Sequence, residues 1–178
     1  MNAIDTKLHA SPSTCPFDFS CTEEGISGLE AITLEAFLNV AKEYLQRTQT
    51  RLMVTSAKRS LKHTASLMSA FSIGQLEGMY CRNGYPDYIR TMKDAMERLN
   101  RKLTPEETYE ILRNRQEGYI SSHLFGGAID IAAEGLADKA LLISLLHSAG
   151  FTTLDETDLG VQCIHASHST VPKSFVRE

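Results

Sequence analysis

The sequence predicts an α+β fold in which helices pack on one face of a small antiparallel sheet. Helical patterns dominate the earlier part of the 178 residues, and short β-type runs dominate the later part. Such a segregation of helices from strands is typical of the α+β class. Apolar residues make up 42% of the chain, so a core can form without disulfides or structural metals.

Composition divides the chain into an arm, a domain and an insertion within the domain. Residues 1–26 are polar and contain several Ser, Thr and Pro residues, which predicts an extended N-terminal arm lying over the domain. Residues 27–178 are then the single domain. A mainly helical insertion is expected at about 61–118, where it would flank or cover a cleft.

The first elements of the domain follow from local spacing. Ser27 and Glu30 have the spacing of a capping box. Apolar residues recur at helical intervals behind them, so we expect a helix that ends near Thr48. The β-type run at 51–55 predicts a strand.

Helix starts and turns mark the insertion. Asp87 is placed to cap a helix, and Thr104-Pro105 followed by two glutamates is a strong helix start. Aromatic residues of helices usually pack in the core, so we assign no site role to the tyrosines of this segment, which are Tyr80, Tyr85, Tyr88, Tyr109 and Tyr119.

Strands are expected mainly near the C-terminus. An apolar run predicts a buried strand at 128–132, and a helix is expected at 136–148 with Gly150 closing it. Two further strands are expected at 151–154 and 161–166.

Charge and composition exclude several classes of partner. The net charge is −4 and the pI is near 5.9, which argues against sequence-independent binding to nucleic acid or anionic membranes. No apolar run reaches the length of a membrane span. Residues 1–24 lack the pattern of a secretory signal, so we expect synthesis in the cytoplasm without export by that route. The four cysteines show no C-x-x-C spacing, and we expect free thiols, the alternative being a Cys15–Cys21 disulfide.

The segment 121–130, which reads SSHLFGGAID, carries the clearest chemical signal. It separates His123 from Asp130 by a glycine turn that leads into an apolar strand, and His165 follows in a later strand. Two histidines and a carboxylate are ligands of catalytic zinc, which keeps its fourth position for a water of lowered pKa. The sequence therefore predicts that His123, Asp130 and His165 bind Zn²⁺.

These residues resemble the zinc-dependent D-Ala-D-Ala peptidases, including the VanY-like carboxypeptidases, whose fold is shared with the hedgehog signalling domain. The family pattern S-x-H-x-x-G-x-A-x-D is matched without a gap by Ser121, His123, Gly126, Ala128 and Asp130. A second family element, a strand leading into S-G-Y-R-S, resembles residues 56–60, where Ala57 and Lys58 replace the Gly and the aromatic residue. The third element is a late strand with the last ligand, here His165, after the Gly150-Phe151 pair.

The resemblance implies a Zn²⁺ enzyme that hydrolyses amide bonds in the stem peptides of bacterial peptidoglycan, as a carboxypeptidase or an endopeptidase. His123, Asp130 and His165 would bind the metal. Arg59 would stabilise an oxyanion or hold a substrate carboxylate. Ser121 would support the metal site or contact substrate. The scissile bond stays open among D-Ala-D-Ala, L-Ala-D-Glu and a cross-bridge.

The chain departs from the family at the general base. Many members carry a glutamate three residues before the last histidine, where this chain has Gln162, whose amide cannot take a proton. Other relatives have an H-x-H pair, whose first position here is Cys163. We favour Glu156 as the base. The alternatives are Asp155, Asp158 and His168, of which His168 is also an alternative ligand to His165.

A second hypothesis follows from this departure. The chain would be a catalytically silent module on the same scaffold that binds a wall peptide or a protein partner through its metal cleft. A cytosolic structural metal protein is a third hypothesis, which leaves Arg59 without a role. A wall peptidase without an export signal would reach its substrate by lysis or by a specialised secretion machine, or would recycle wall fragments in the cytoplasm.

Overall fold

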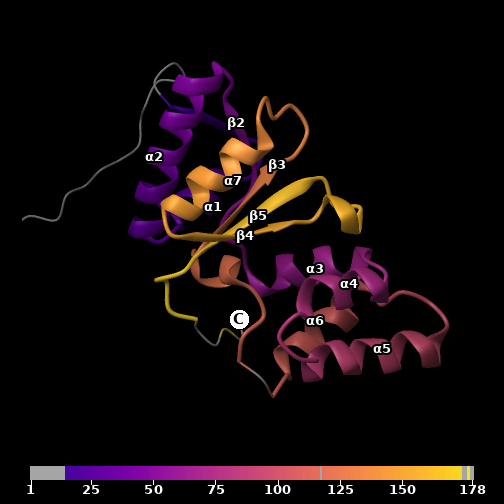
Figure 1. Cartoon of the computed structure of the whole chain (residues 1–178). Coiled ribbons are helices and arrows are strands. Elements are labelled where there is room, and N and C mark those ends of the chain that lie inside the picture. The colour runs from indigo at the N-terminus through magenta and orange to yellow at the C-terminus, as the bar shows by residue number, and fades with distance from the viewer. Residues whose placement is uncertain (1–14, 117, 174–175, 177–178) are drawn as a thin grey trace, which may run out of the picture.

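The computed structural model describes residues 15–116, 118–173 and 176, and it has an α+β fold with a five-stranded mixed sheet (Figure 1). Seven α-helices and two 3₁₀ helices accompany the sheet in this part of the chain. The elements in chain order are β1 (Phe17–Phe19), α1 (Glu23–Ser27), α2 (Ala31–Thr48), β2 (Leu52–Ser56), α3 (Leu61–Ala70), α4 (Ile73–Tyr80), α5 (Asp87–Leu99), α6 (Pro105–Arg113), η1 (Ser122–Phe125), β3 (Ala128–Ala132), α7 (Lys139–Ser148), β4 (Phe151–Asp155), η2 (Thr157–Leu159) and β5 (Cys163–His168).

The sheet has the strand order β1-β2-β3-β5-β4. The pairs β2–β3, β3–β5 and β5–β4 are antiparallel, as predicted, but β1 is parallel to β2. The expectation of an antiparallel sheet is therefore wrong at this edge. The chain passes from β1 to β2 through α1 and α2, and such a crossover brings the second strand back in the same direction.

The N-terminal region differs from the extended arm that the sequence predicted. Residues 17–19 form β1, and Thr22 caps α1 by accepting a hydrogen bond from the Gly25 amide. Polar composition concealed this strand because only Phe17 is buried in it. Residues 1–14 of the predicted arm lie outside the described residues.

Helices α2 and α7 cover one face of the sheet (Figure 1). Phe37 and Tyr44 of α2 pack with Ile129 and Ile131 of β3, and all four are fully buried. Burying a side chain of this size contributes about 1.5–3 kcal/mol. The helix begins at Ala31, so the predicted capping box is wrong.

The predicted capping box does not form because of the way the chain links α1 to α2. Ser27 is the last residue of α1, and Glu30 precedes α2 without a side-chain cap. The Glu30 amide instead donates a hydrogen bond to the carbonyl oxygen of Gly126. A tertiary contact therefore replaces the local cap that the spacing suggested.

The predicted helical insertion contains α3, α4, α5 and α6, which form a second core. Leu61, Leu76, Ile89 and Leu112 are fully buried in it. The helix start predicted at Thr104-Pro105 is confirmed, and Thr104 and Glu107 make a capping box there. Asp87 is the first residue of α5, while Pro86 occupies the cap position. Figure 1 shows this helical group beside the sheet, away from α2 and α7.

A cleft of about 1730 Å³ lies between the sheet and the helical group, because side chains from both line it. Alternation along β3 directs Ile129 and Ile131 toward α2 and α7, and it therefore places Asp130 on the opposite face.

No helix in the described ranges is both long and apolar enough for a membrane span. All four cysteines are unpaired in this structure.

Candidate metal centre

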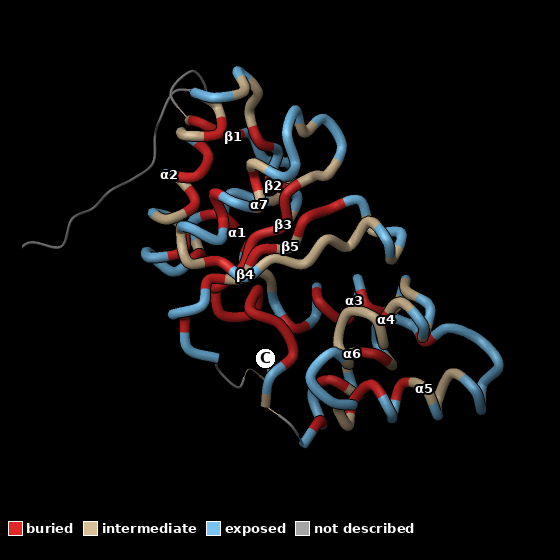
Figure 2. The backbone as a smooth tube through the Cα atoms, in the orientation of Figure 1, coloured by how far each residue is buried: buried red, intermediate tan, exposed pale blue. Residues whose placement is uncertain are grey.

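The motif around His123 lies in the interior of the protein. Residues 120–131 are buried throughout, as Figure 2 shows for this stretch between the two cores. The Ser121 hydroxyl accepts a hydrogen bond from the His123 amide at 3.4 Å and so caps η1. Gly126 ends η1 with φ +77°, and a Cβ there would lie 2.5 Å from the Gly28 carbonyl oxygen. Glycine is therefore required at this position by backbone conformation and by packing.

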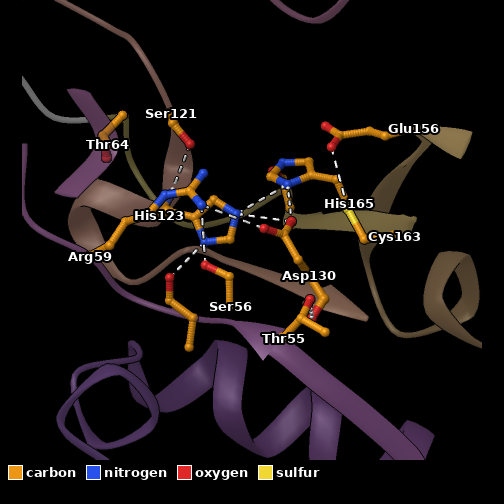
Figure 3. Close-up of polar contacts among 12 residues, drawn as sticks. Thr55, Ser56, Arg59, Thr64, Ser121, His123, Asp130, Glu156, Cys163 and His165 are labelled. Carbon is orange, nitrogen blue, oxygen red and sulfur yellow. Dashed lines mark hydrogen bonds and ion pairs between the residues drawn. The ribbon is translucent and has the colours of Figure 1, made fainter. Parts of the chain in front are cut away.

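The structure brings the three predicted ligands together. Asp130 of β3 and His165 of β5 are register partners on adjacent strands, and His123 approaches them from η1 (Figure 3). Asp130 Oδ1 lies 3.1 Å from His123 Nε2 and 2.8 Å from His165 Nδ1. The two nitrogens are 3.2 Å apart. This group of two histidines and an aspartate could hold a metal ion.

The hydrogen bond of His123 determines which nitrogen faces the group. His123 Nδ1 lies 2.6 Å from the carbonyl oxygen of Ala57, which can only accept, so Nδ1 carries the ring proton. Burial, and after it the nearby charge of Arg59, lowers the pKa of His123 to about 4, against an opposing effect of Asp130. At neutral pH the ring is therefore neutral, and Nε2 presents a lone pair to Asp130.

The Asp130 carboxylate stays ionised beside this lone pair. Burial alone would raise its pKa, but a hydrogen bond from His165 Nδ1 acts in the opposite direction, and the pKa lies well below its usual range. The neutral His123 nitrogen and the carboxylate oxygen are thus two acceptors 3.1 Å apart. Two acceptors at this distance favour a cation shared between them, which fits a metal centre.

The spacing of the three atoms also fits zinc. Tetrahedral ligands about 2.0–2.1 Å from Zn²⁺ lie about 3.3 Å apart. The observed separations of 2.8 to 3.2 Å would need to open by only a few tenths of an ångström. Neutral imidazole and carboxylate are the ligand types that zinc accepts.

Arg59 lies beside the other oxygen of Asp130. Its Nη1 is 3.6 Å from Asp130 Oδ2 and donates to Ser56 Oγ at 3.2 Å. Its backbone amide donates to the carbonyl oxygen of His123, which ties residue 59 to η1. The Arg59 Nε atom is buried and has no hydrogen-bond partner within the described part of the chain. Arg59 also lines the cleft, with 14% of its side chain exposed.

Glu156 lies across the group from Arg59, near His165 in Figure 3. Its Oε2 accepts a hydrogen bond from the Cys163 thiol at 3.3 Å. Burial, together with the charge of Asp130, raises the pKa of Glu156. Burial also raises the pKa of Cys163, so this thiol stays protonated and donates. The predicted base is thus held in the cleft with one carboxylate oxygen engaged.

Of the other candidates for the base, His168 lines the same cleft, whereas Asp155 and Asp158 are not among its lining residues. Asp155 pairs with Lys139 and accepts from Thr157, and Asp158 is exposed. His168 contacts Thr170 Oγ1 through Nδ1, and its ring packs edge-on against Phe151. The group that could hold a metal ion contains His165 and not His168. Of the five tyrosines named in the helical insertion, those that line the cleft are Tyr80, Tyr85, Tyr88 and Tyr119.

Two contacts of the metal centre did not enter the sequence prediction. One is the Ala57 carbonyl, because backbone acceptors have no sequence signature. The other is Ser167, whose hydroxyl lies 2.8 Å from His165 Nε2. Its position two residues after a predicted strand ligand was a usable signal, because residues i and i+2 share a face of a strand.

No family model, curated protein or solved structure matches this chain. The site itself therefore carries the functional argument, as a candidate metal centre at the side of a large cleft in an α+β protein.

Proposed function

We propose that this protein is a zinc-dependent peptidase that hydrolyses amide bonds in the stem peptides of bacterial peptidoglycan. The observation that carries the proposal is the convergence of His123 Nε2, Asp130 Oδ1 and His165 Nδ1 beside an open cleft. The resemblance of the motifs around these residues to D-Ala-D-Ala peptidases supports the substrate class.

The three candidate ligands differ in how far their side chains are exposed to the cleft. The His123 side chain is fully enclosed, whereas the side chains of Asp130 and His165 are 11% and 20% exposed. The group therefore opens to the cleft on the side of these two residues. Zn²⁺ bound there would supply Lewis acidity, which lowers the pKa of water and polarises an amide carbonyl.

Glu156 is the proposed proton acceptor. A carboxylate whose pKa is raised toward the working pH is a better general base than an ordinary one. The Cys163 thiol occupies Oε2, which leaves Oε1 to take a proton from the attacking water. The same oxygen can then return the proton to the amine that leaves.

Arg59 is the proposed electrostatic group. Ser56 and Asp130 hold its guanidinium in place, so little reorganisation is needed when negative charge develops in the cleft. Its remaining N–H groups can stabilise an oxyanion or bind a substrate carboxylate.

The test combines metal content with release of soluble peptides from purified peptidoglycan, measured by mass spectrometry. One equivalent of zinc and cleavage are expected for the wild type, and both should be lost in His123→Ala. Glu156→Gln should keep zinc and lose cleavage. His147→Ala is a matched control, because His147 is an exposed histidine of α7 that contacts Thr153. A wild type that contains no metal and cleaves no wall would refute the proposal.

A second candidate is a catalytically silent module that binds wall peptides through the same cleft. The observation that favours it is the presence of Gln162 and Cys163 where the resembling family has its proton-transfer group. Zinc binding and co-sedimentation with peptidoglycan, without peptide release from several wall types, would establish this alternative over the peptidase.

A further inference from the structure

We propose that Ser167 is a positioning residue that directs Nδ1, rather than Nε2, of His165 to the metal. The inference rests on the metal site of the proposed function and concerns how that site is built. It follows from the two contacts of the His165 ring, which are on opposite sides. Nδ1 lies 2.8 Å from Asp130 Oδ1, and Nε2 lies 2.8 Å from Ser167 Oγ.

A neutral imidazole has one N–H group and one lone pair. If Nδ1 binds a cation, the ring proton must be on Nε2, and that N–H then needs an acceptor. The Ser167 hydroxyl oxygen is the acceptor in hydrogen-bond range. Such partners of ligating histidines orient the ring and raise its basicity.

The strand holds Ser167 in place. Ser167 and His165 lie on the same face of β5, since they are two residues apart. The strand is paired on both sides, where Ala128 of β3 and Thr152 of β4 are the register partners of Ser167. The hydroxyl is therefore positioned by the sheet and does not depend on a loop.

The two histidines differ in the kind of partner they have. The Ala57 carbonyl can only accept, so His123 keeps its proton on Nδ1 whether or not a metal is bound. A serine hydroxyl can accept or donate. Ser167 can therefore donate to Nε2 when Nδ1 binds Asp130 as a proton donor, and accept from Nε2 when Nδ1 binds a metal. Ser167 is half-buried and lines the cleft, where its own proton can find another acceptor.

The first experiment measures zinc affinity by competition with a chelator. Ser167→Ala should weaken zinc binding by about 10–100-fold, the range found for outer partners of ligating histidines. Ser167→Thr keeps the hydroxyl and should retain an affinity close to that of the wild type. Ser169→Ala is the matched control, since Ser169 is an exposed serine on the same segment.

A second readout separates positioning from a general loss of structure. In the zinc-loaded wild type, ¹⁵N NMR should show metal-bound Nδ1 and protonated Nε2 for His165. A folded Ser167→Ala protein should show a weakened preference for this arrangement, and its thermal unfolding without metal should stay close to that of the wild type.

The outcomes distinguish this inference from the proposed function. Equal zinc affinity in the wild type and Ser167→Ala, or coordination through Nε2, would overturn the role of Ser167 and leave the peptidase proposal intact. Weakened zinc binding in Ser167→Ala without wall cleavage by any variant would support the role of Ser167 and refute the peptidase. A wild type that binds no zinc would overturn both.

Discussion

The buried ring of His123 should make the stability of the metal-free protein depend on pH. In the folded chain, burial lowers its pKa from 6.5 to about 4. In the unfolded chain the ring has its usual pKa of about 6.5. Between these values the unfolded state binds a proton that the folded state does not, so the free energy of unfolding falls as the pH falls. The contribution of His123 to the free energy of unfolding is fully present above pH 6.5, the pKa in the unfolded chain. It is lost as the pH falls to about 4, the pKa in the folded chain.

The magnitude follows from the size of the shift. Each factor of ten in proton affinity corresponds to about 1.4 kcal/mol, so lowering the pKa from 6.5 to about 4 corresponds to about 3 kcal/mol. The side chain is fully buried, so solvent does not reduce this figure. Glu156 has the opposite effect on stability. Its pKa is raised in the folded protein, so as the pH falls the folded state takes up this proton before the unfolded state does, and the free energy of unfolding rises. Asp130, whose pKa is lowered, loses its contribution only below its ordinary value of 3.8.

The assay is urea unfolding with a chelator present, from about pH 7.5 to 4.5. The comparison is with His123→Asn, whose side-chain amide can still donate to the Ala57 carbonyl but does not titrate. Because Glu156 is present in both proteins, the difference between the two slopes isolates His123. A difference of about 1 kcal/mol per pH unit is expected. Parallel curves would refute the neutral buried imidazole, and with it the argument that a lone pair faces Asp130.

Three further substitutions test the fold and the site. Gly126→Ala should destabilise the protein by about 2 kcal/mol or more in urea unfolding, because φ is +77° and the Cβ would meet the backbone of Gly28; an unchanged midpoint would contradict that packing. Ile129→Ala should cost about 2–5 kcal/mol because this side chain is fully buried against the helices. Its zinc affinity should stay close to wild type, since Asp130 occupies the other face, and a large loss of zinc would argue against this separation. Arg59→Gln should lower peptide release by about 100-fold while zinc content persists, and full activity would remove Arg59 from the mechanism.

Local patterns in the sequence determined much of the fold. The strand at 128–132 and the helix start at Thr104 match the structure because an apolar run and a capping pattern are local signals that can be recognised in the sequence. The α+β class followed from the order of such segments along the chain. The convergence of the three candidate ligands was also predictable, because His123 and Asp130 share one short motif and His165 lies in a recognisable strand.

Periodicity alone did not determine which face of a helix is buried. Apolar residues occur on more than one face of α2, so their spacing does not single out the buried face. The structure buries Phe37 and Tyr44 and leaves Ile32 about half exposed, at 49%. The sheet decides this, because it fixes the direction from which α2 is covered.

Tertiary structure alone decided the parallel pairing of β1 and the contacts that orient the site. The direction of β1 depends on a crossover whose path has no local signature. The nitrogen that each histidine presents depends on Ala57 and Ser167, one of which contributes a backbone oxygen. The sequence by itself determined which ligand types are present, because these are properties of residues. Their orientation and protonation were decided by the fold, because hydrogen bonds and burial act between segments that only folding brings together.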